Sequence, residues 1–323
     1  MKNSWKCEKG GIALIDIINL TKKFKQNTVV NTINMQLEEG EIVGLLGPNG
    51  AGKSTTISMI SSLLNPTSGD IQLHGKSILK QPKELRAILG VVPQEIALYQ
   101  ELSAQENLLF FGRIQKLPKD VLHDRVEEVL EIIGLQDRRK DLVKTFSGGM
   151  KRRLNIGVAL LHNPKFIIMD EPTVGIDPQS RNYILETVQK LNKERDMTVL
   201  YTSHYMEEVE FLCDRIYIMD HGEIIASGTK EEIKQILSSE NTVEVKLEMP
   251  SIEFEEALRN CKQITSVTSK GANITIIAPK GVNMFDMIIP ISEKVHVSFI
   301  SIEIKNPTLE DVFLHLTGRV LRN

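Results

Sequence analysis

The chain has 323 residues, of which 41% are hydrophobic and 25% are charged, a composition typical of a globular protein with room for about two domains. Its formal net charge of −3 indicates no basic surface, so we expect no nucleic-acid partner. The cysteines Cys7, Cys213 and Cys261 lie far apart, which argues against a disulfide framework and a zinc site and fits a reducing cytosol.

The sequence carries no pattern of a membrane-embedded segment. Residues 1–11 predict a polar leader without the apolar core of a signal peptide. No run approaches the roughly 18 apolar residues that a membrane span requires. If the protein acts at a membrane, we therefore expect a partner to carry the spans.

A glycine-rich loop follows the apolar run 42–46 and leads into a helix start at 56–60. Strand, loop and helix in this order are typical of a phosphate-binding loop, whose backbone N–H groups surround anionic oxygens. Lys53 is expected to reach the terminal phosphates and Ser54 to bind a bridging Mg²⁺. The loop consists of Gly47, Pro48, Asn49, Gly50, Ala51, Gly52, Lys53, Ser54 and Thr55. These residues predict a nucleoside triphosphate site.

Around this loop the pattern alternates between strands and helices, which predicts an α/β fold with a parallel core. Leu122, Val126, Val129, Leu130 and Ile133 share one helix face, and Gly134 is expected to end that helix. The helical stretch within residues 95–162 is predicted to be an insertion into the core. Strands are expected at 12–19, 29–37, 71–73, 88–92, 166–169, 197–201 and 216–219.

A polar stretch at 238–242 predicts a domain boundary, with the first domain over 12–238 and a second over 239–323. In the second domain the expected order is strand, helix, two strands, helix, strand and a last helix over 308–317. This order resembles a small α+β, ferredoxin-like domain.

The apolar strand from Phe166 ends in two adjacent carboxylates, Asp170 and Glu171. Beside a phosphate loop, Asp170 is expected to contact the Mg²⁺, and Glu171 to polarise an attacking water as general base. Taken alone, a strand that merely ends at charged residues is an equally good explanation.

Ser147, Gly148 and Gly149 precede a basic helix and predict a second anion site made of backbone N–H groups, although Ser147 is also a good helix cap. The run from Lys151 to Arg153 is expected to be a solvated helix face. Asp177 before Pro178 predicts another capped helix start.

With these elements in order over roughly residues 12–230, the chain resembles the nucleotide-binding subunit of an ATP-binding cassette (ABC) transporter. The phosphate loop matches the family's Walker A motif, the 166–171 strand its Walker B motif, and Ser147 to Gly149 the start of its signature motif. Gln94, Asp177 and His204 match the Q-loop, the D-loop and the switch histidine. Phe24 stands where the family places an aromatic residue that stacks on adenine.

The resemblance implies a P-loop NTPase core with an antiparallel β subdomain and a helical insertion. It implies that Lys53, Gln94, Glu171 and His204 carry ATP hydrolysis and that Ser54, Gln94 and Asp170 surround the Mg²⁺. It also implies a head-to-tail dimer, either of two copies or with a paired ATPase subunit, in which each ATP lies between one subunit's phosphate loop and the other's signature motif.

The same resemblance implies that the protein works with a separate multi-span permease and lies at the cytoplasmic face of the cell membrane. Met150 stands where the family usually has a glutamine after the signature glycines, and it cannot donate the hydrogen bonds of a glutamine side-chain amide. This form of the motif, together with the tail at 310–319, looks like the drug- and antibiotic-export branch. Two alternatives stay open, a soluble ABC ATPase that regulates translation or DNA repair and an importer ATPase with a regulatory tail.

Overall fold

The computed structural model describes residues 13–318 except 204, 237–239, 280–281 and 306–307. These residues form two compact units, one ending at Lys230 and the other beginning at Glu231. The structure therefore divides the chain before the predicted boundary at 238–239, which lies outside the described residues, as does the predicted leader. Each unit is described by itself.

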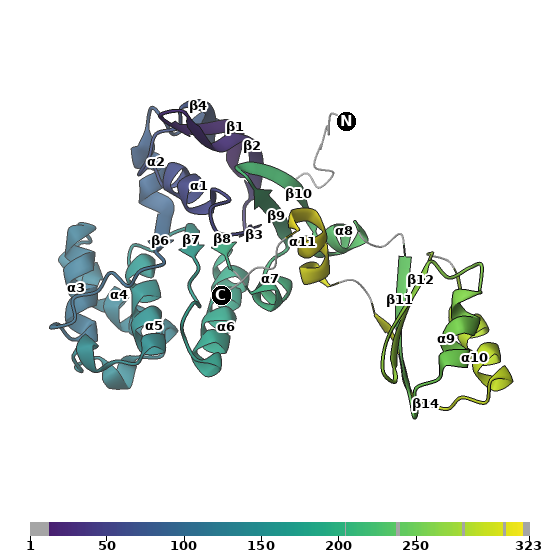
Figure 1. Cartoon of the computed structure of the whole chain (residues 1–323). Helices are drawn as coiled ribbons and strands as arrows, with labels where there is room; N and C mark the ends of the chain where they lie inside the picture. Colours follow the sequence, from purple (N-terminus) through teal and green to yellow (C-terminus); the bar gives the residue numbers. More distant parts are fainter. Residues whose placement is uncertain (1–12, 204, 237–239, 280–281, 306–307, 319–323) are drawn as a thin grey trace. The chain divides into compact units, whose positions relative to one another are not determined.

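The centre of the first unit is a six-stranded sheet (Figure 1). Five of its strands are parallel and only β10 runs antiparallel, beside β9. In spatial order the strands are β10 (Glu223–Thr229), β9 (Arg215–Asp220), β3 (Ile42–Leu46), β8 (Thr198–Thr202), β7 (Phe166–Asp170) and β6 (Leu89–Val92). Because parallel strands end at the same edge, their carboxyl ends gather the loops that follow them.

A second, antiparallel sheet completes the predicted β subdomain and shares a hydrophobic core with the central sheet. Its order is β2 (Asn27–Glu38), β1 (Ala13–Phe24), β4 (Ser68–Leu73) and β5 (Lys76–Ser77). The helix α1 (Lys53–Ile60) contacts both β2 and β7, and thus joins the two sheets. A short helix, α2 (Pro82–Ile88), precedes β6.

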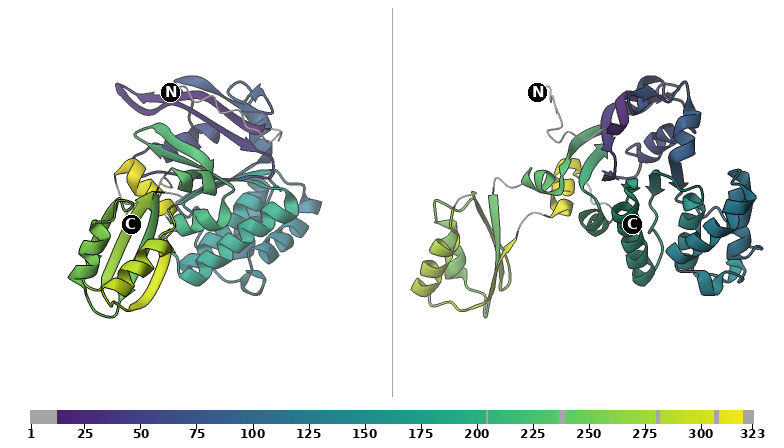
Figure 2. Two further views of the ribbon diagram at one scale, coloured as in Figure 1. Left: turned by 90° about the vertical axis from the view of Figure 1, so that its right-hand side faces the viewer. Right: turned by 180° about the vertical axis from the view of Figure 1, so that it is seen from behind.

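The predicted helical insertion consists of α3 (Ala104–Ile114), α4 (Lys119–Ile132) and α5 (Gly148–Leu160), which pack on one another (Figure 2). Ser103 and Glu106 form a capping box that begins α3. The predicted apolar face of α4 is buried, and Gly134 after it has a φ of +61°, as a helix-ending glycine requires. Two further helices, α6 (Pro178–Arg195) and α7 (Met206–Leu212), follow β7 and β8.

The second unit has a four-stranded antiparallel sheet in the order β12 (Ser266–Lys270), β13 (Asn273–Pro279), β11 (Glu240–Leu247) and β14 (Phe299–Lys305). The helices α9 (Ile252–Arg259) and α10 (Phe285–Lys294) cover one face of it (Figure 1). Alternate residues of β11 and β13 point into a core that includes Phe254 and Ile288, so the predicted α+β fold is confirmed. The unit also includes α8 (Lys230–Gln235), which begins at the border, and α11 (Leu309–Thr317).

Among the residues that the structure describes, no helix is both long enough and apolar enough to cross a membrane.

Candidate functional site

Four neighbouring strands of the central sheet deliver the predicted site residues to one edge. The phosphate loop follows β3, Asp170 ends β7 and Glu171 comes directly after it, and Gln94 comes two residues after β6. Thr202, which was not among the predicted site residues, ends β8. These strands are adjacent in the sheet order β3-β8-β7-β6. Residues that are more than a hundred positions apart in sequence therefore meet at the carboxyl edge, where parallel sheets bind ligands.

The phosphate loop has a backbone that only glycine suits at two positions. Gly52 precedes α1 with a φ of +109°, and a Cβ there would lie 2.7 Å from the carbonyl oxygen of Val29. A Cβ on Gly47 would lie 2.2 Å from the carbonyl oxygen of Met219. The loop is thus pressed against β2 and β9, which hold its backbone in place at the start of α1.

Lys53 is buried and folds back over its own loop. Its Nζ donates to the carbonyl oxygens of Gly47 at 2.7 Å and Pro48 at 3.3 Å. Burial lowers the pKa of the Lys53 ammonium, while the charges of Glu171 and Asp170 act in the opposite direction. The structure therefore brings the lysine of the phosphate loop within electrostatic reach of both carboxylates.

Thr202 contacts both Asp170 and Glu171. Its hydroxyl donates to Oδ1 of Asp170 at 2.8 Å and accepts from the backbone N–H of Glu171 at 2.9 Å. Glu171 has a φ of +48°, a left-handed backbone that is uncommon outside glycine and that turns the chain sharply where β7 ends. The backbone thus bends between Asp170 and Glu171, at the point where the strand ends.

Gln94 lies directly against the buried Glu171. Its amide Nε2 donates to Oε2 of Glu171 over 2.9 Å, so the Q-loop residue contacts the residue expected to be the general base. The side chain of Gln94 itself is exposed.

Ser147 caps α5 by accepting a hydrogen bond from the backbone N–H of Met150 at 3.2 Å. A Cβ on Gly149 would lie 2.0 Å from Oγ of Ser180, whereas one on Gly148 would meet only the carbonyl oxygen of Gly175, at 3.9 Å. The signature segment thus packs against the start of α6. Ser147 and Gly148 remain exposed.

Asp177 caps α6 by accepting from the backbone N–H of Ser180 at 2.8 Å, and Pro178 takes the first helical position, as predicted. This hydrogen bond from Ser180 is the largest cause that lowers the pKa of the Asp177 carboxyl. The structure thus shows the capping role of Asp177, and its nucleotide contact stays a prediction.

The prediction of a solvated face at 151–153 is wrong for Arg152. This residue is 5% exposed, and its guanidinium donates to the carbonyl oxygens of Pro93 at 2.9 Å and Gln94 at 2.7 Å. Arg153 is also engaged, since it donates to the carbonyl oxygen of Ile133 and stacks on Tyr183. The sequence shows the run of basic residues, but it does not show which backbone carbonyl groups will accept hydrogen bonds from Arg152 and Arg153.

Sequence reasoning also missed Glu208, a buried carboxylate on α7. Its Oε2 accepts from the hydroxyls of Thr173, Tyr201 and Ser203 at 2.8, 2.9 and 2.6 Å. The hydroxyl of Ser203 in turn accepts from the backbone N–H of Tyr205. The residues on either side of position 204 are thereby held, while His204 itself lies outside the described residues.

Phe24 stands at the end of β1 with 46% of its surface exposed, and the ammonium of Lys22 lies 5.2 Å from its ring centre. An exposed aromatic face of this kind suits stacking on a base. Its role toward adenine remains a prediction.

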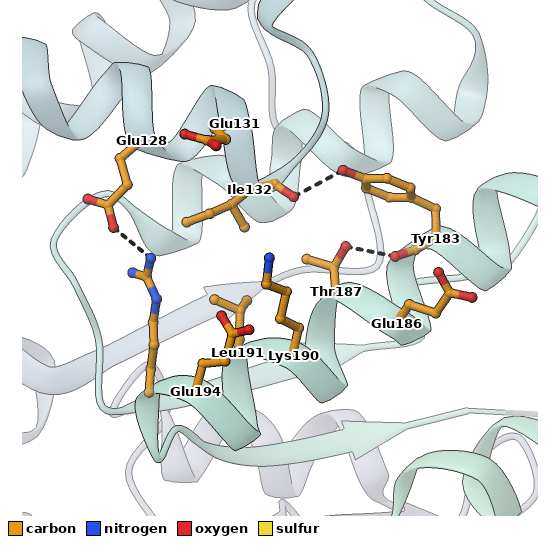
Figure 3. A pocket seen from close by; sticks show the side chains of 10 residues that line it. Glu128, Glu131, Ile132, Tyr183, Glu186, Thr187, Lys190, Leu191 and Glu194 are labelled. Carbon is orange, nitrogen blue, oxygen red and sulfur yellow. Dashed lines mark hydrogen bonds and ion pairs between the residues drawn. The ribbon is translucent and has the colours of Figure 1, made fainter.

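A pocket of about 410 Å³ lies elsewhere in the first unit, between α4 and α6 (Figure 3). Glu128 and Arg195 form an ion pair across it at 2.6 Å, and the hydroxyl of Tyr183 donates to the carbonyl oxygen of Ile132. None of the predicted site residues lines it. The pocket is therefore separate from the edge of the sheet where the predicted site residues gather.

Comparisons with known proteins show which family the chain is similar to. Residues 30–174 match the family model described as "ABC transporter". The chain is 48% identical over 307 residues to the linearmycin resistance ATP-binding protein LnrL of Bacillus subtilis, with 94% of this chain and 98% of that protein covered. It is 33% identical to the daunorubicin/doxorubicin resistance ATP-binding protein DrrA of Streptomyces peucetius, with 94% and 92% covered.

A solved structure of the ATP-binding cassette MJ0796, a dimer bound to ADP and Pi in a post-hydrolysis state, is similar in fold. It superimposes with a TM-score of 0.60 and 28% sequence identity over 67% of this chain and 98% of that one.

Proposed function

The chain belongs to the ABC transporter family as an ATP-hydrolysing subunit, and we propose that it powers export of an antibiotic- or drug-like molecule through a separate membrane permease. The observation that carries the ATPase chemistry is the meeting of the phosphate loop, Asp170, Glu171 and Gln94 at one edge of the sheet. The names of LnrL and DrrA, to which this chain is similar along almost its whole length, support the direction and the cargo class.

The phosphate loop and Lys53 would hold the triphosphate. Here the backbone N–H groups before α1 and the positive end of that helix favour anionic oxygens. The ammonium of Lys53, now bound to two loop carbonyls, is placed to turn toward the terminal phosphates. Phe24 would stack on the adenine, and Asn49, Gly50, Ala51 and Thr55 complete the cradle.

The residues at the strand ends also fit Mg²⁺. Ser54 on the first turn of α1, Asp170 held by Thr202, and the amide oxygen of Gln94 are the oxygen donors that Mg²⁺ prefers. No cluster of three His, Cys, Asp or Glu side chains that could hold a metal occurs among the described residues, which suits an ion whose other ligands are phosphate and water. When bound, Mg²⁺ would neutralise charge on the phosphates.

Glu171 would act as the general base. Its carboxylate is buried beside Lys53 and accepts a hydrogen bond from Gln94, so its orientation toward an attacking water is restricted. His204, between Ser203 and Tyr205, would hydrogen-bond the terminal phosphate and help to orient the water. Glu208 would keep the backbone around position 204 in place through Ser203.

A head-to-tail dimer would complete each site. Ser147 and Gly148 are exposed at the start of α5, where backbone N–H groups can bind the nucleotide of a second subunit. Such a contact needs the terminal phosphate as a bridge, so ATP favours the closed dimer and hydrolysis releases it. Because Met150 offers no amide donor, this contact would depend on Ser147 and on the backbone.

An aromatic patch in the helical insertion would contact the permease at the cytoplasmic face of the membrane. We define the aromatic patch as Tyr99, Phe110 and Phe111, whose rings lie 4.7 to 6.0 Å apart. Tyr99 is 51% exposed, and the nearby side chains of Ile96 and Ile114 are exposed as well. Exposed apolar groups gathered in this way mark protein contacts. Tyr99 lies five positions after Gln94, so a permease that moves Tyr99 would act on the catalytic edge.

Purification from native membranes tests this proposal. The chain with Glu171→Gln, in the presence of ATP, is expected to recover a multi-span permease that mass spectrometry identifies. Tyr99→Ala with Phe111→Ala should lose that permease, whereas Phe211→Ala, which removes an exposed phenylalanine of α7, should retain it. Recovery of ribosomes or DNA-repair factors in place of a permease would overturn the export role. Deletion of the gene should also sensitise cells to at least one exported antibiotic.

A further inference from the structure

One face of α5 holds the loop that carries Gln94. The guanidinium of Arg152 donates to the carbonyl oxygens of Pro93 at 2.9 Å and Gln94 at 2.7 Å. Asn155, three positions on and also buried, accepts from the backbone N–H of Ala97 at 3.4 Å. Both ends of the segment from Pro93 to Ala97 are therefore bound to the same helix.

Stability alone does not explain why a charged arginine is buried at this position. Burial lowers the pKa of Arg152, which means that the protein interior disfavours its charge. Within the described part of the chain, its Nε has no hydrogen-bond partner. Two carbonyl oxygens satisfy this guanidinium only in part. Its burial is therefore weak evidence for a stabilising role, because a well-packed apolar side chain at such a site often gives equal or greater stability.

The role of Arg152 follows from the two elements that it connects, α5 and the loop that carries Gln94. Arg152 lies in the second turn of α5, the helix that begins after Ser147. The other end of its contact, Gln94, donates its side-chain amide to Glu171 at 2.9 Å. The guanidinium of Arg152 thus connects two elements. One is α5, which is expected to meet the nucleotide of a second subunit, and the other is Gln94, which contacts Glu171 of the same subunit.

We propose that Arg152 is a positioning residue that ties the Gln94 loop to α5, so that the placement of Gln94 against Glu171 depends on the position of α5. The inference rests on the proposed head-to-tail dimer. When a nucleotide of the second subunit binds at Ser147, α5 is fixed, and through Arg152 so is Gln94. Since such coupling is reciprocal for binding free energies, the two ATP sites of a dimer should act cooperatively.

A double-mutant cycle on ATP hydrolysis tests the proposal. Arg152→Met removes the donors with little change in length, and Gln94→Ala removes the contact to Glu171. We expect Arg152→Met to lower kcat on the order of tenfold with KM for ATP changed less than about twofold, because a misplaced group slows the chemical step. The double variant should be no slower than Gln94→Ala alone, since both changes act through one contact.

Arg153→Met is the matched control. It removes the same charge from the next position of the same helix, together with hydrogen bonds to the carbonyl oxygens of Ile133 and Gly134 and the stacking on Tyr183. We expect its kcat to stay within about twofold of the wild type, because it does not touch the Gln94 loop. Arg152→Lys keeps one donor group and should recover part of the lost kcat, and it replaces Arg152→Met in the cycle if the methionine variant does not fold.

Cooperativity supplies a second readout. The Hill coefficient of wild-type ATP hydrolysis should exceed one and fall toward one in Arg152→Met but not in Arg153→Met. Equal kcat and Hill coefficients in Arg152→Met and Arg153→Met would overturn the inference. A double variant whose loss in kcat equals the product of the losses in Arg152→Met and Gln94→Ala would overturn it as well. A wild-type chain that hydrolyses ATP as a monomer would instead overturn the proposed dimer, so the two failures are distinguishable.

Discussion

The amide nitrogen of Gln94 lies 2.9 Å from a carboxylate oxygen of Glu171, although 77 positions separate the two residues in sequence. The contact exists because β6 and β7 are parallel neighbours, so the residues after each strand meet at one edge. It joins the residue expected to activate water to a loop that leads, five residues later, to the aromatic patch. The predictions below concern the groups that hold this edge together.

Thr202→Val should impair hydrolysis without a change in side-chain shape. The buried hydroxyl of Thr202 binds both Asp170 and the backbone N–H of Glu171, and valine leaves the two groups without this partner. We expect a loss of about 1–3 kcal/mol of unfolding free energy and a fall in kcat on the order of tenfold. Urea unfolding and steady-state ATPase assays measure both. Thr202→Ser keeps the hydroxyl and should lie near the wild type, and an unaffected valine variant would contradict the assigned role.

The two neighbouring glycines of the signature segment should respond differently to alanine. A Cβ on Gly149 would lie 2.0 Å from Oγ of Ser180, so Gly149→Ala should force α5 away from α6 and cost about 1–3 kcal/mol of stability. Gly148→Ala meets nothing closer than 3.9 Å and should fold normally. Denaturant unfolding compares the two variants.

If Gly148 contacts the second subunit's nucleotide, Gly148→Ala should still lose the ATP-dependent dimer in size-exclusion chromatography. A Gly148→Ala variant that dimerises as the wild type does would count against a close nucleotide approach at this position.

The cap of α6 should give a pH-dependent contribution to stability. The hydrogen bond from the N–H of Ser180 lowers the pKa of Asp177 in the folded chain, so the carboxylate form is favoured there. The resulting stability is present above the unfolded pKa of about 3.9 and is lost as the pH falls through the lower folded pKa. Asp177→Asn keeps a capping oxygen but does not titrate.

The measurement is the melting temperature of both proteins by circular dichroism from pH 7 downward. The wild type should melt above Asp177→Asn at pH 7, and the difference should shrink as the pH falls through the acidic range. A difference that is constant over the whole range would mean that the charge of Asp177 does not stabilise α6.

Local patterns made much of this structure predictable. Glycines before Lys53, an apolar strand ending at Asp170, and Asp177 before Pro178 each specify a nearby backbone conformation, and the structure has these conformations. The order of elements after residue 240 likewise sufficed to predict the α+β fold of the second unit.

Contacts between distant segments could not be read in the same way. The burial of Arg152 depends on backbone carbonyl groups about 58 and 59 positions away, which no side-chain pattern reveals. Thr202 and Glu208 look like ordinary polar residues in sequence. Only the pairing of β7 with β8 shows that Thr202 lies beside Asp170, and only the fold brings Thr173 to Glu208, 35 positions away. The edge strand β10 was missed because its mixed, partly exposed residues have no clear alternation.

The most direct test of the account compares Glu171→Gln with the wild type in ATP binding, ATP hydrolysis and size-exclusion chromatography. Glutamine keeps the shape of the side chain but cannot accept a proton from water, so kcat should fall at least on the order of a hundredfold while ATP still binds. With hydrolysis blocked and Mg²⁺ present, the variant should accumulate as an ATP-bound dimer that the wild type forms only transiently. Hydrolysis by Glu171→Gln near the wild-type rate would contradict the assignment of Glu171 as the general base.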